Sequence, residues 1–379
     1  MQKVVLFIDS LGSGGAQRQL VLLARLLNEA EYYEPIVVCY HQADHLKFML
    51  DDVGISYHLI KKNHIVDLMF LVKFVLFLRR VKPDVLVSYL NTPNMWARLA
   101  GLFVNINCII TSERNIDLYK SKLRVCIERL LFPLSDKVVV NAYSIKEMLT
   151  ASLGFDVNKI KVIYNAVDTN VFYPLSNETV DIYRHELGLS TADYVIALPG
   201  RLQGQKNHMC LINALLDLDS KTLSKIKVLF VGYETDLSLK EKLIEIISKN
   251  NLQSVIRFCG VKSDMTTIYN LSDIIILPSL WEGLPNVVIE AMACERLVVV
   301  SNIADNSKII EHGKNGFIFK SNDSHQLSKL IEECIALNAK ALNEIRKSAK
   351  QWVIQNCSPE RFIADYSEIM KSTYKSNNT

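Results

Sequence analysis

The feature of this sequence that most constrains its fold is a repeated alternation of short apolar runs with longer amphipathic ones. Runs such as residues 4–8, 84–89 and 137–140 are rich in Val, Ile and Leu and have the length of buried strands, whereas the segments between them have a helical period. This order of elements is typical of βαβ units, in which helices cover both faces of a parallel sheet. We therefore predict an α/β fold.

The alternation occurs twice along the chain, which predicts two doubly wound domains. A first series of strands ends near residue 163, a polar segment follows, and a second series begins at residues 194–198. Because 379 residues exceed one typical core, we predict a Rossmann-like N-terminal domain over residues 1–170 and a Rossmann-like C-terminal domain over residues 171–357. We expect the amphipathic segment 358–379 to pack back on the first domain. Ligands of such folds bind beyond the carboxyl ends of the strands, and the cleft between two facing domains is the expected site.

Composition excludes several other classes of protein. Apolar residues make up 49% of the chain and the net charge is +3, so the chain is not disordered. The eight cysteines form no C-x-x-C pair and the eight histidines no H-E-x-x-H motif. We therefore expect buried free thiols in a reducing compartment and no metal site. We also expect no nucleic acid as partner. The chain begins directly with a strand-like run and no signal-peptide pattern, so we expect a cytoplasmic protein.

The longest apolar stretch runs from Ile65 to Leu78 and contains Asp67 and Lys73. It is too short to span a bilayer. We expect a packed helix of the first domain. A helix lying on the membrane is the alternative, because the basic pair Arg79-Arg80 follows it.

Two carboxylates in one strand-turn-helix segment are the most informative candidates for a binding site. Glu282 lies in the turn after the apolar run 274–277, and Glu290 lies in the helix that we expect from Val287 onward. Free N–H groups at such a helix start favour an anion. An anion site with a carboxylate on each side suggests a ligand that carries both phosphates and hydroxyls, such as a nucleotide-sugar.

Two further loops carry groups that suit phosphates. In the second domain, Arg201 and Lys206 follow the strand 194–198, where two cations could neutralise a diphosphate. In the first domain, Gly14 and Gly15 follow the first strand. The spacing of this glycine run is not that of a dinucleotide-binding fingerprint, and no acidic residue ends the second strand.

In combination these motifs resemble the retaining glycosyltransferases of family 4, also called glycosyl transferases group 1, which have the GT-B fold. The resemblance rests on the loop from Gly200 to Lys206, on the E-x7-E spacing of Glu282 and Glu290, and on the glycine loop at 12–15. The segments 162–168, 230–232 and 314–319 match as well. The motifs occur in the order typical of the family and span nearly the whole chain.

The resemblance implies a role for each matching residue. Arg201 and Lys206 would bind the donor diphosphate, Glu290 the ribose hydroxyls and Glu282 hydroxyls of the transferred sugar. Arg201, Lys206 and Glu282 would form the catalytic set, and the family is thought to use same-face attack, so no nucleophile is named. The remaining donor-binding positions implied are Gly14, Gly15, Gly260, Val261, Gly283, Leu284, Asn286 and Val287.

Two departures from the family concern the end of the helix that carries Glu290 and the loops expected to bind the acceptor. Many relatives have Cys-Gly-x-Pro where this chain has Cys294-Glu-Arg-Leu297, so the helix lacks a glycine C-cap. Relatives often have a histidine near the acceptor, whereas the matching loop here contains Arg114. Arg114 and Asn91 are candidate acceptor residues, with loop capping as an equally good interpretation.

The resemblance implies a metal-independent hexosyltransferase without a cofactor. Its donor would be a UDP-sugar that carries a hexose or N-acetylhexosamine. Its acceptor would be a polyprenyl-diphosphate-linked oligosaccharide of a bacterial surface polysaccharide such as O-antigen, lipopolysaccharide or capsule, at the cytoplasmic face of the inner membrane. Alternatives are an enzyme like UDP-N-acetylglucosamine 2-epimerase and a non-catalytic nucleotide-sugar-binding module. The oligomeric state stays open.

Overall fold

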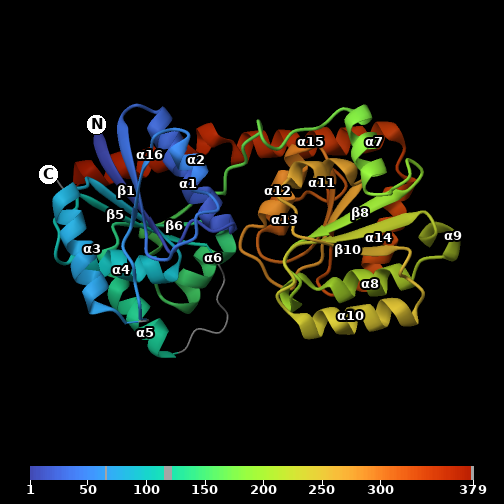
Figure 1. Ribbon diagram of the computed structural model, residues 1–379, viewed down its shortest axis with the longest axis horizontal. Helices are drawn as coiled ribbons and strands as arrows, with labels where there is room; N and C mark the ends of the chain where they lie inside the picture. The colour runs from blue at the N-terminus through green and yellow to red at the C-terminus, as the bar shows by residue number, and fades with distance from the viewer. Residues whose placement is uncertain (65, 115–121, 377–379) are drawn as a thin grey trace. The chain divides into compact units, whose positions relative to one another are not determined.

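The computed structural model describes residues 1–64, 66–114 and 122–376 and divides the chain into two compact units (Figure 1). Unit 1 comprises Met1–Ala166 with the C-terminal stretch from Pro359, and unit 2 comprises Val167–Ser358. The chain thus passes from one unit to the other after Ala166 and again after Ser358. Each unit contains one parallel sheet with helices packed on it, which confirms the predicted doubly wound α/β fold.

Unit 1 is built on a seven-stranded parallel sheet with the order β3-β2-β1-β4-β5-β6-β7. Its strands are β1 (Gln2–Ile8), β2 (Tyr33–Cys39), β3 (Ser56–Leu59), β4 (Val85–Tyr89), β5 (Cys108–Glu113), β6 (Lys137–Val140) and β7 (Ile160–Val162). Its helices are α1 (Gly15–Glu29), α2 (Phe48–Asp51), α3 (Leu68–Val81), α4 (Asn91–Gly101), α5 (Lys122–Leu131), α6 (Tyr143–Glu147) and α16 (Pro359–Ser376), with short turns η1 (Phe132–Leu134), η2 (Met148–Ser152) and η3 (Val157–Lys159).

Unit 2 is built on a six-stranded parallel sheet with the order β10-β9-β8-β11-β12-β13. Its strands are β8 (Tyr194–Pro199), β9 (Ile226–Val231), β10 (Ile256–Gly260), β11 (Ile274–Leu277), β12 (Leu297–Ser301) and β13 (Phe317–Phe319). Its helices are α7 (Asn177–Glu186), α8 (His208–Leu216), α9 (Ser220–Leu223), α10 (Leu237–Lys249), α11 (Met265–Leu271), α12 (Asn286–Ala293), α13 (Asn306–Ile309), α14 (Ser324–Ala336) and α15 (Ala339–Cys357), with the turn η4 (Gly204–Lys206).

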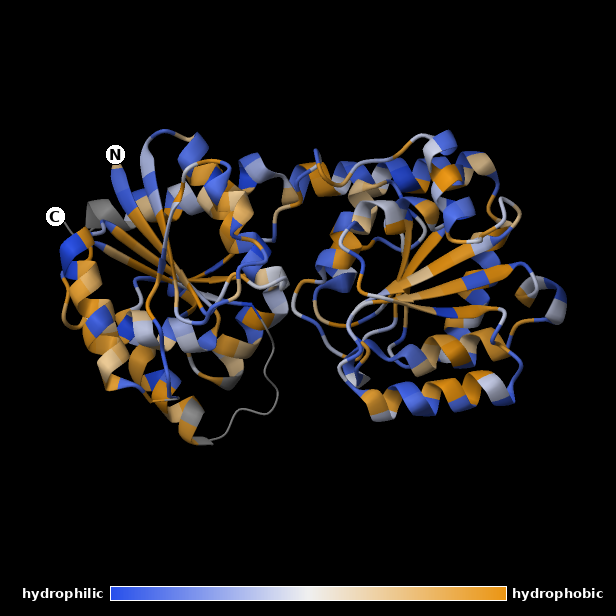
Figure 2. Cartoon of the chain, in the orientation of Figure 1, coloured by the Kyte–Doolittle hydropathy of each residue, from blue (hydrophilic) through white to orange (hydrophobic). Residues whose placement is uncertain are grey.

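The central strands are apolar on both faces because helices cover both sides of each sheet (Figure 2). In β1, all residues from Val4 to Ile8 are fully buried. Val4 and Leu6 pack in one core cluster with α1, whereas Val5 and Phe7 pack in another with α3 and α4. An alternation of sides along one strand therefore builds two cores from a single apolar run.

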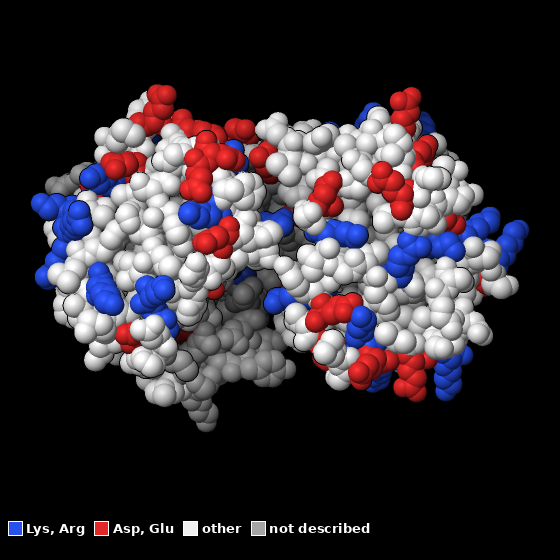
Figure 3. Space-filling view, in the orientation of Figure 1, with Lys and Arg blue, Asp and Glu red and all other residues white. Residues whose placement is uncertain are grey.

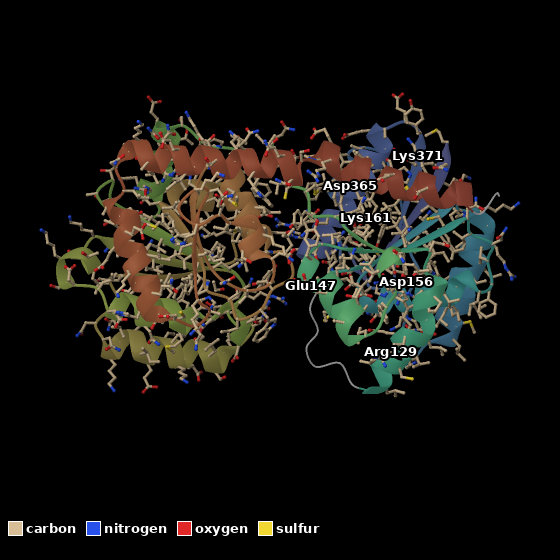
Figure 4. All side chains as sticks on the ribbon, turned by 180° about the vertical axis from the view of Figure 1, so that it is seen from behind. Arg129, Glu147, Asp156, Lys161, Asp365 and Lys371 are labelled. Carbon is tan, nitrogen blue, oxygen red and sulfur yellow. The ribbon has the colours of Figure 1, made fainter. Side chains whose placement is uncertain are left out.

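Helix α16 packs on unit 1, where Phe362, Tyr366 and Met370 join the core cluster of β1 and α1. The buried Tyr366 hydroxyl lies 2.7 Å from the hydroxyl of Tyr89 on β4. At the surface, Glu368 of α16 forms an ion pair with Lys161 of β7 at 3.3 Å, in the region that Figure 4 marks with Lys161 and Asp365. Apolar burial, a buried hydroxyl pair and one surface ion pair thus hold the C-terminal helix.

Helix α3 accounts for most of the apolar stretch that was predicted as a packed helix. Phe70, Phe74 and Leu78 are buried in the core of unit 1, and the Asp67 carboxylate caps the helix by accepting from the Phe70 N–H at 2.9 Å. The first residue of the predicted stretch, Ile65, lies outside the described residues. Among the helices described, none has both the length and the apolar character needed to cross a membrane.

Candidate active site

The strand order of unit 2 reverses between β8 and β11, and the loops that follow these two strands carry three of the predicted residues. Arg201 and Lys206 follow β8, and Glu282 follows β11. Parallel strands place their carboxyl ends at one edge of the sheet, and the point where the order reverses is where doubly wound folds bind ligands. The topology therefore brings the two separate motifs together.

Lys206 and Glu282 form a largely buried ion pair, with Nζ 2.5 Å from Oε1 and side chains that are 13% and 10% exposed. The Glu282 carboxylate also accepts from Ser279 Oγ at 2.8 Å and from Gln205 Nε2 at 3.3 Å. The β8 loop is joined to the β11 loop through its backbone as well, because the Leu280 N–H donates to the Gln205 carbonyl at 2.8 Å. These contacts hold the carboxylate in one orientation.

Glu290 lies in the second turn of α12 and is half-buried. Its Oε2 accepts from the hydroxyl of Tyr269 on α11 at 2.6 Å, and Tyr269 itself is fully buried. Tyr269 was not a predicted site residue. No local motif marks it, because it lies 21 residues before Glu290 and meets it only through packing of α11 against α12.

The start of α12 has no side-chain cap, since its N-cap residue is Pro285. Uncapped N–H groups at a helix start carry the positive end of the helix dipole. The predicted donor residues of this segment surround that start: Leu284 is buried, and Gly283, Asn286 and Val287 are half-buried. The segment can therefore present backbone donors next to Glu282.

Arg201 is exposed and has no hydrogen bond or ion pair within the described residues. The residue before it, Gly200, lies against Gly232, which follows β9. A Cβ on Gly232 would stand 2.1 Å from the Gly200 carbonyl oxygen, and its φ of +153° is one that side chains rarely adopt. Two glycines thus let the ends of β8 and β9 approach closely and set the position from which Arg201 leaves the sheet.

Gly260 and Val261, two of the predicted donor-binding residues, are the last residue of β10 and the residue after it. Gly260 has φ +60° with open space where a Cβ would be, and Val261 is 50% exposed. Both are therefore accessible at the same sheet edge as Arg201. In unit 1, Gly14 is the N-cap of α1 and Gly15 its first residue, and both are exposed.

The end of α12 shows how the chain accommodates its missing glycine. Glu295 takes the left-handed conformation, with φ +54°, that usually favours glycine. The Arg296 N–H closes the helix end by donating to the Ala291 carbonyl at 2.9 Å, and the Glu295 carboxylate accepts from Lys350 of α15 at 2.8 Å. An ion pair to α15 thus anchors a residue in a conformation that is unfavourable by itself.

Asn91 and Arg114, the predicted acceptor residues, line one pocket of about 240 Å³ in unit 1. Sequence reasoning missed Asp9, Tyr40 and Thr92, which line the same pocket. Asp9 and Tyr40 directly follow β1 and β2, so their positions at strand ends were a signal that could have identified them.

Arg114 is buried and held by side chains from three elements. It donates to Ser112 Oγ at 2.8 Å, to Asn165 Oδ1 and to the Tyr366 hydroxyl at 3.2 Å, and its guanidinium lies 4.1 Å from the Tyr89 ring centroid. The hydroxyl of Tyr366 thus ties α16 to the pocket. These contacts position the guanidinium and are more than a loop cap.

Within the described residues, no group of three or more His, Cys, Asp or Glu side chains could hold a metal ion. The cysteines found buried include Cys39 and Cys294, and burial raises the pKa of Cys294 to about 12. No disulfide joins any of the eight cysteines, all of which are free. Six of the eight are buried as predicted, whereas Cys126 is exposed and Cys259 is half-buried.

Two models of known protein families match this chain. The model of Glycosyltransferase Family 4 matches residues 13–171, and the model of Glycosyl transferases group 1 matches residues 180–352. The two matches together span most of the chain. This chain is a family 4 glycosyltransferase.

The glycosyltransferase has relatives of similar length among characterised enzymes. It is 24% identical over 315 residues to the UDP-Gal:alpha-D-GlcNAc-diphosphoundecaprenol alpha-1,3-galactosyltransferase of Escherichia coli, covering 76% of this chain and 75% of that enzyme. It is 26% identical over 316 residues to the N-acetylgalactosamine-N,N'-diacetylbacillosaminyl-diphospho-undecaprenol 4-alpha-N-acetylgalactosaminyltransferase of Campylobacter jejuni, covering 80% of this chain and 81% of that enzyme.

Solved structures resemble the glycosyltransferase over its whole length. The Anabaena protein HepE, crystallised in complex with UDP, superimposes with a TM-score of 0.87 at 20% identity and covers 98% of this chain and 100% of its own. A glycosyltransferase from Rickettsia africae superimposes with a TM-score of 0.87 at 23% identity and covers 99% of both chains. These similarities confirm the predicted GT-B fold.

Proposed function

We propose that this glycosyltransferase moves a hexose or N-acetylhexosamine from a UDP-sugar to a polyprenyl-diphosphate-linked glycan, with retention of configuration. The observation that carries the proposal is the set of Arg201, Lys206, Glu282 and Glu290 at one edge of the unit 2 sheet, where its strand order reverses. Two cations and two carboxylates at that edge suit a ligand with phosphates and hydroxyls.

Arg201 and Lys206 are the groups that would bind the donor diphosphate. Departure of the diphosphate from the sugar leaves negative charge on phosphate and positive charge on the anomeric carbon, and fixed cations stabilise the former. Lys206 uses one N–H on Glu282, and an ammonium has three donors. Lys206 can therefore contact phosphate while it stays paired.

The two carboxylates would bind hydroxyls at opposite ends of the donor. Glu282 accepts from Lys206, Ser279 and Gln205, and a carboxylate has about four acceptor sites, so it can also accept from a sugar hydroxyl. Glu290, oriented by Tyr269, would accept from the ribose hydroxyls. Binding of the acceptor by Asn91 and Arg114 in unit 1 belongs to the same proposal.

Two features of related proteins support the choice of substrates. The names of both characterised relatives describe substrates joined to undecaprenol through diphosphate, and HepE was crystallised with UDP. For this chain we correspondingly propose a UDP-sugar as donor and a lipid-linked acceptor, in the synthesis of a bacterial surface polysaccharide. We further propose that the reaction needs no metal and no cofactor, because Arg201 and Lys206 supply positive charge at the diphosphate.

The donor proposal is tested by Glu290→Ala and Lys206→Ala in the full chain. UDP affinity, measured by calorimetry, should fall by about tenfold or more in each, since each change removes a charge-assisted hydrogen bond. Tyr173→Phe, at an exposed tyrosine of unit 2, serves as the control. Unchanged UDP affinity in Glu290→Ala would reject the assignment, and strict loss of transfer in EDTA would reject metal independence. Formation of a 2-epimer from UDP-N-acetylglucosamine would favour the epimerase alternative.

We also propose a peripheral contact of unit 1 with the cytoplasmic face of the inner membrane through α3. Leu68, Met69, Val72 and Leu76 are each more than half exposed and lie on one face of α3. Figure 3 shows Lys and Arg gathered where α3 lies in Figure 1, and the exposed Lys73 belongs to the same helix. An apolar helix face flanked by basic residues suits an anionic bilayer surface.

The membrane contact is tested by flotation with vesicles of phosphatidylethanolamine and phosphatidylglycerol. Leu76→Ser combined with Lys73→Glu should release the protein, and vesicles without the anionic lipid should bind it more weakly. Lys240→Glu, on α10 of unit 2, is the matched control. Equal flotation of the α3 variant and the wild type would refute the contact.

A further inference from the structure

The pocket of unit 1 lies at the point where the strand order of its sheet reverses. The reversal falls between β1 and β4. Residues that follow β1, β2, β4 and β5 line one cavity of about 240 Å³, among them Asp9, Tyr40, Thr92 and Arg114. The pocket is therefore built by four separate chain segments at the edge where doubly wound folds bind ligands.

Asp9 presents a fixed carboxylate to this pocket. Its Oδ1 accepts from the Ser10 N–H at 2.7 Å and from Gln17 Nε2 at 2.9 Å. Its Oδ2 has no hydrogen-bond partner among the described residues. Because one oxygen is held and the other is available, the carboxylate is oriented before any ligand arrives.

Arg114 supplies the opposite charge. A guanidinium has five N–H donors, and Arg114 uses three of them on Ser112, Asn165 and the Tyr366 hydroxyl. The Tyr89 side chain is a further hydrogen-bond partner of the guanidinium. A buried guanidinium that lines a cavity gives it a fixed positive charge and N–H donors, which suit a polar ligand.

Charge and size together select the class of ligand. The available Asp9 oxygen repels phosphate, so a diphosphate does not suit this pocket, whereas neutral hydroxyls can donate to the carboxylate and accept from Arg114. The volume is below the range of about 300–1,000 Å³ that is typical of pockets for drug-sized ligands. One sugar ring is therefore a better fit than a longer glycan or the lipid diphosphate.

We infer that this pocket binds the terminal sugar of the acceptor glycan, and that Asp9 determines which sugar is accepted by taking hydrogen bonds from its hydroxyls. The inference rests on the proposed transfer to a glycan. It adds to that proposal that the recognised group is a neutral sugar ring and that the Asp9 carboxylate recognises it. The lipid and its diphosphate would lie outside the pocket.

The test uses methyl glycosides of glucose, galactose, N-acetylglucosamine and N-acetylgalactosamine as probes with the full chain. Binding is measured by saturation-transfer NMR, and UDP binding by calorimetry on the same samples. Wild type should bind at least one glycoside. Asp9→Asn should weaken that binding by about tenfold or more, because a hydrogen bond to a charged group is lost, and should leave UDP affinity within about twofold.

Asp44→Asn is the matched control, because Asp44 is an exposed carboxylate that does not line the pocket. Its charge raises the pKa of the Cys39 thiol, as the charge of Asp9 does, so both variants remove a similar nearby charge. It should bind the glycoside as wild type does. Asp9→Ala is the second variant, and the melting temperature of each variant checks that unit 1 is folded. Equal binding by Asp9→Asn and wild type, or no glycoside bound by a wild type that binds UDP, would overturn this inference alone. A wild type that binds no UDP would overturn the proposed function.

Discussion

The ion pair between Lys206 and Glu282 should make a larger contribution to stability than the surface ion pairs of this glycosyltransferase. Lys206→Met removes the ammonium, keeps most of the apolar stem, and leaves Ser279 and Gln205 as the donors to Glu282. Both side chains of the pair are about nine-tenths buried. Removing one partner of a buried pair costs about 3–5 kcal/mol, and because two donors remain we expect a loss of about 3 kcal/mol.

A matched control is the pair Lys240–Glu234, which has a similar N–O distance of 2.7 Å but side chains that are 28% and 31% exposed. For exposed pairs the contribution is about 0–1 kcal/mol, so Lys240→Met should change the free energy of unfolding by no more than that. The difference between the two variants isolates the effect of burial, since both remove a lysine ammonium from an ion pair in unit 2.

The assay is urea unfolding without ligand, monitored by circular dichroism and by fluorescence of Trp281 and Trp352, both in unit 2. Glu282→Gln and the double variant complete a double-mutant cycle, in which we expect a coupling of about 2 kcal/mol. A coupling below about 0.5 kcal/mol would refute the reasoning. So would a Lys206→Met variant as stable as Lys240→Met.

Three further predictions concern unit 2. Burial, and secondarily the charge of Lys206, lowers the pKa of His208 to about 4 from its usual 6.5. Because the unfolded chain takes up the proton first, the free energy of unfolding should fall by up to about 3 kcal/mol as the pH drops from 6.5 to 4. His208→Gln should lose this pH dependence in urea unfolding. Gly232→Ala should lower the free energy of unfolding by about 3 kcal/mol or more, because its Cβ would meet a carbonyl oxygen at 2.1 Å. Tyr269→Phe should weaken UDP binding by about tenfold in calorimetry, because Glu290 loses the hydroxyl that orients it.

Each of these three has a result that would contradict it. An equally steep acid slope in His208→Gln would assign the pH dependence to other groups. Gly204→Ala, where no atom lies within 4 Å of the added Cβ, is the control for Gly232→Ala and should stay within about 1 kcal/mol of wild type. Equal UDP affinity in Tyr269→Phe and wild type would show that Tyr269 does not orient Glu290 for binding.

The sequence by itself determined the fold class, the two sheets and the loops that carry the donor candidates. Runs such as residues 4–8 and 274–277 predict buried parallel strands because strand and helix have different periods, a property of a few neighbouring residues. The same patterns assigned Glu282 to a turn and Glu290 to the helix that follows it, and the structure has them there.

Only the tertiary structure decided which side chains meet. The pairing of Lys206 with Glu282 depends on β8 lying beside β11, and the pocket of Asp9 and Arg114 depends on a sheet order that brings the ends of β1, β4 and β5 together. Strand order follows from long-range packing of the helices and has no local period. Residues such as Asp9 therefore carry no signal in the sequence beyond their place at the end of a strand.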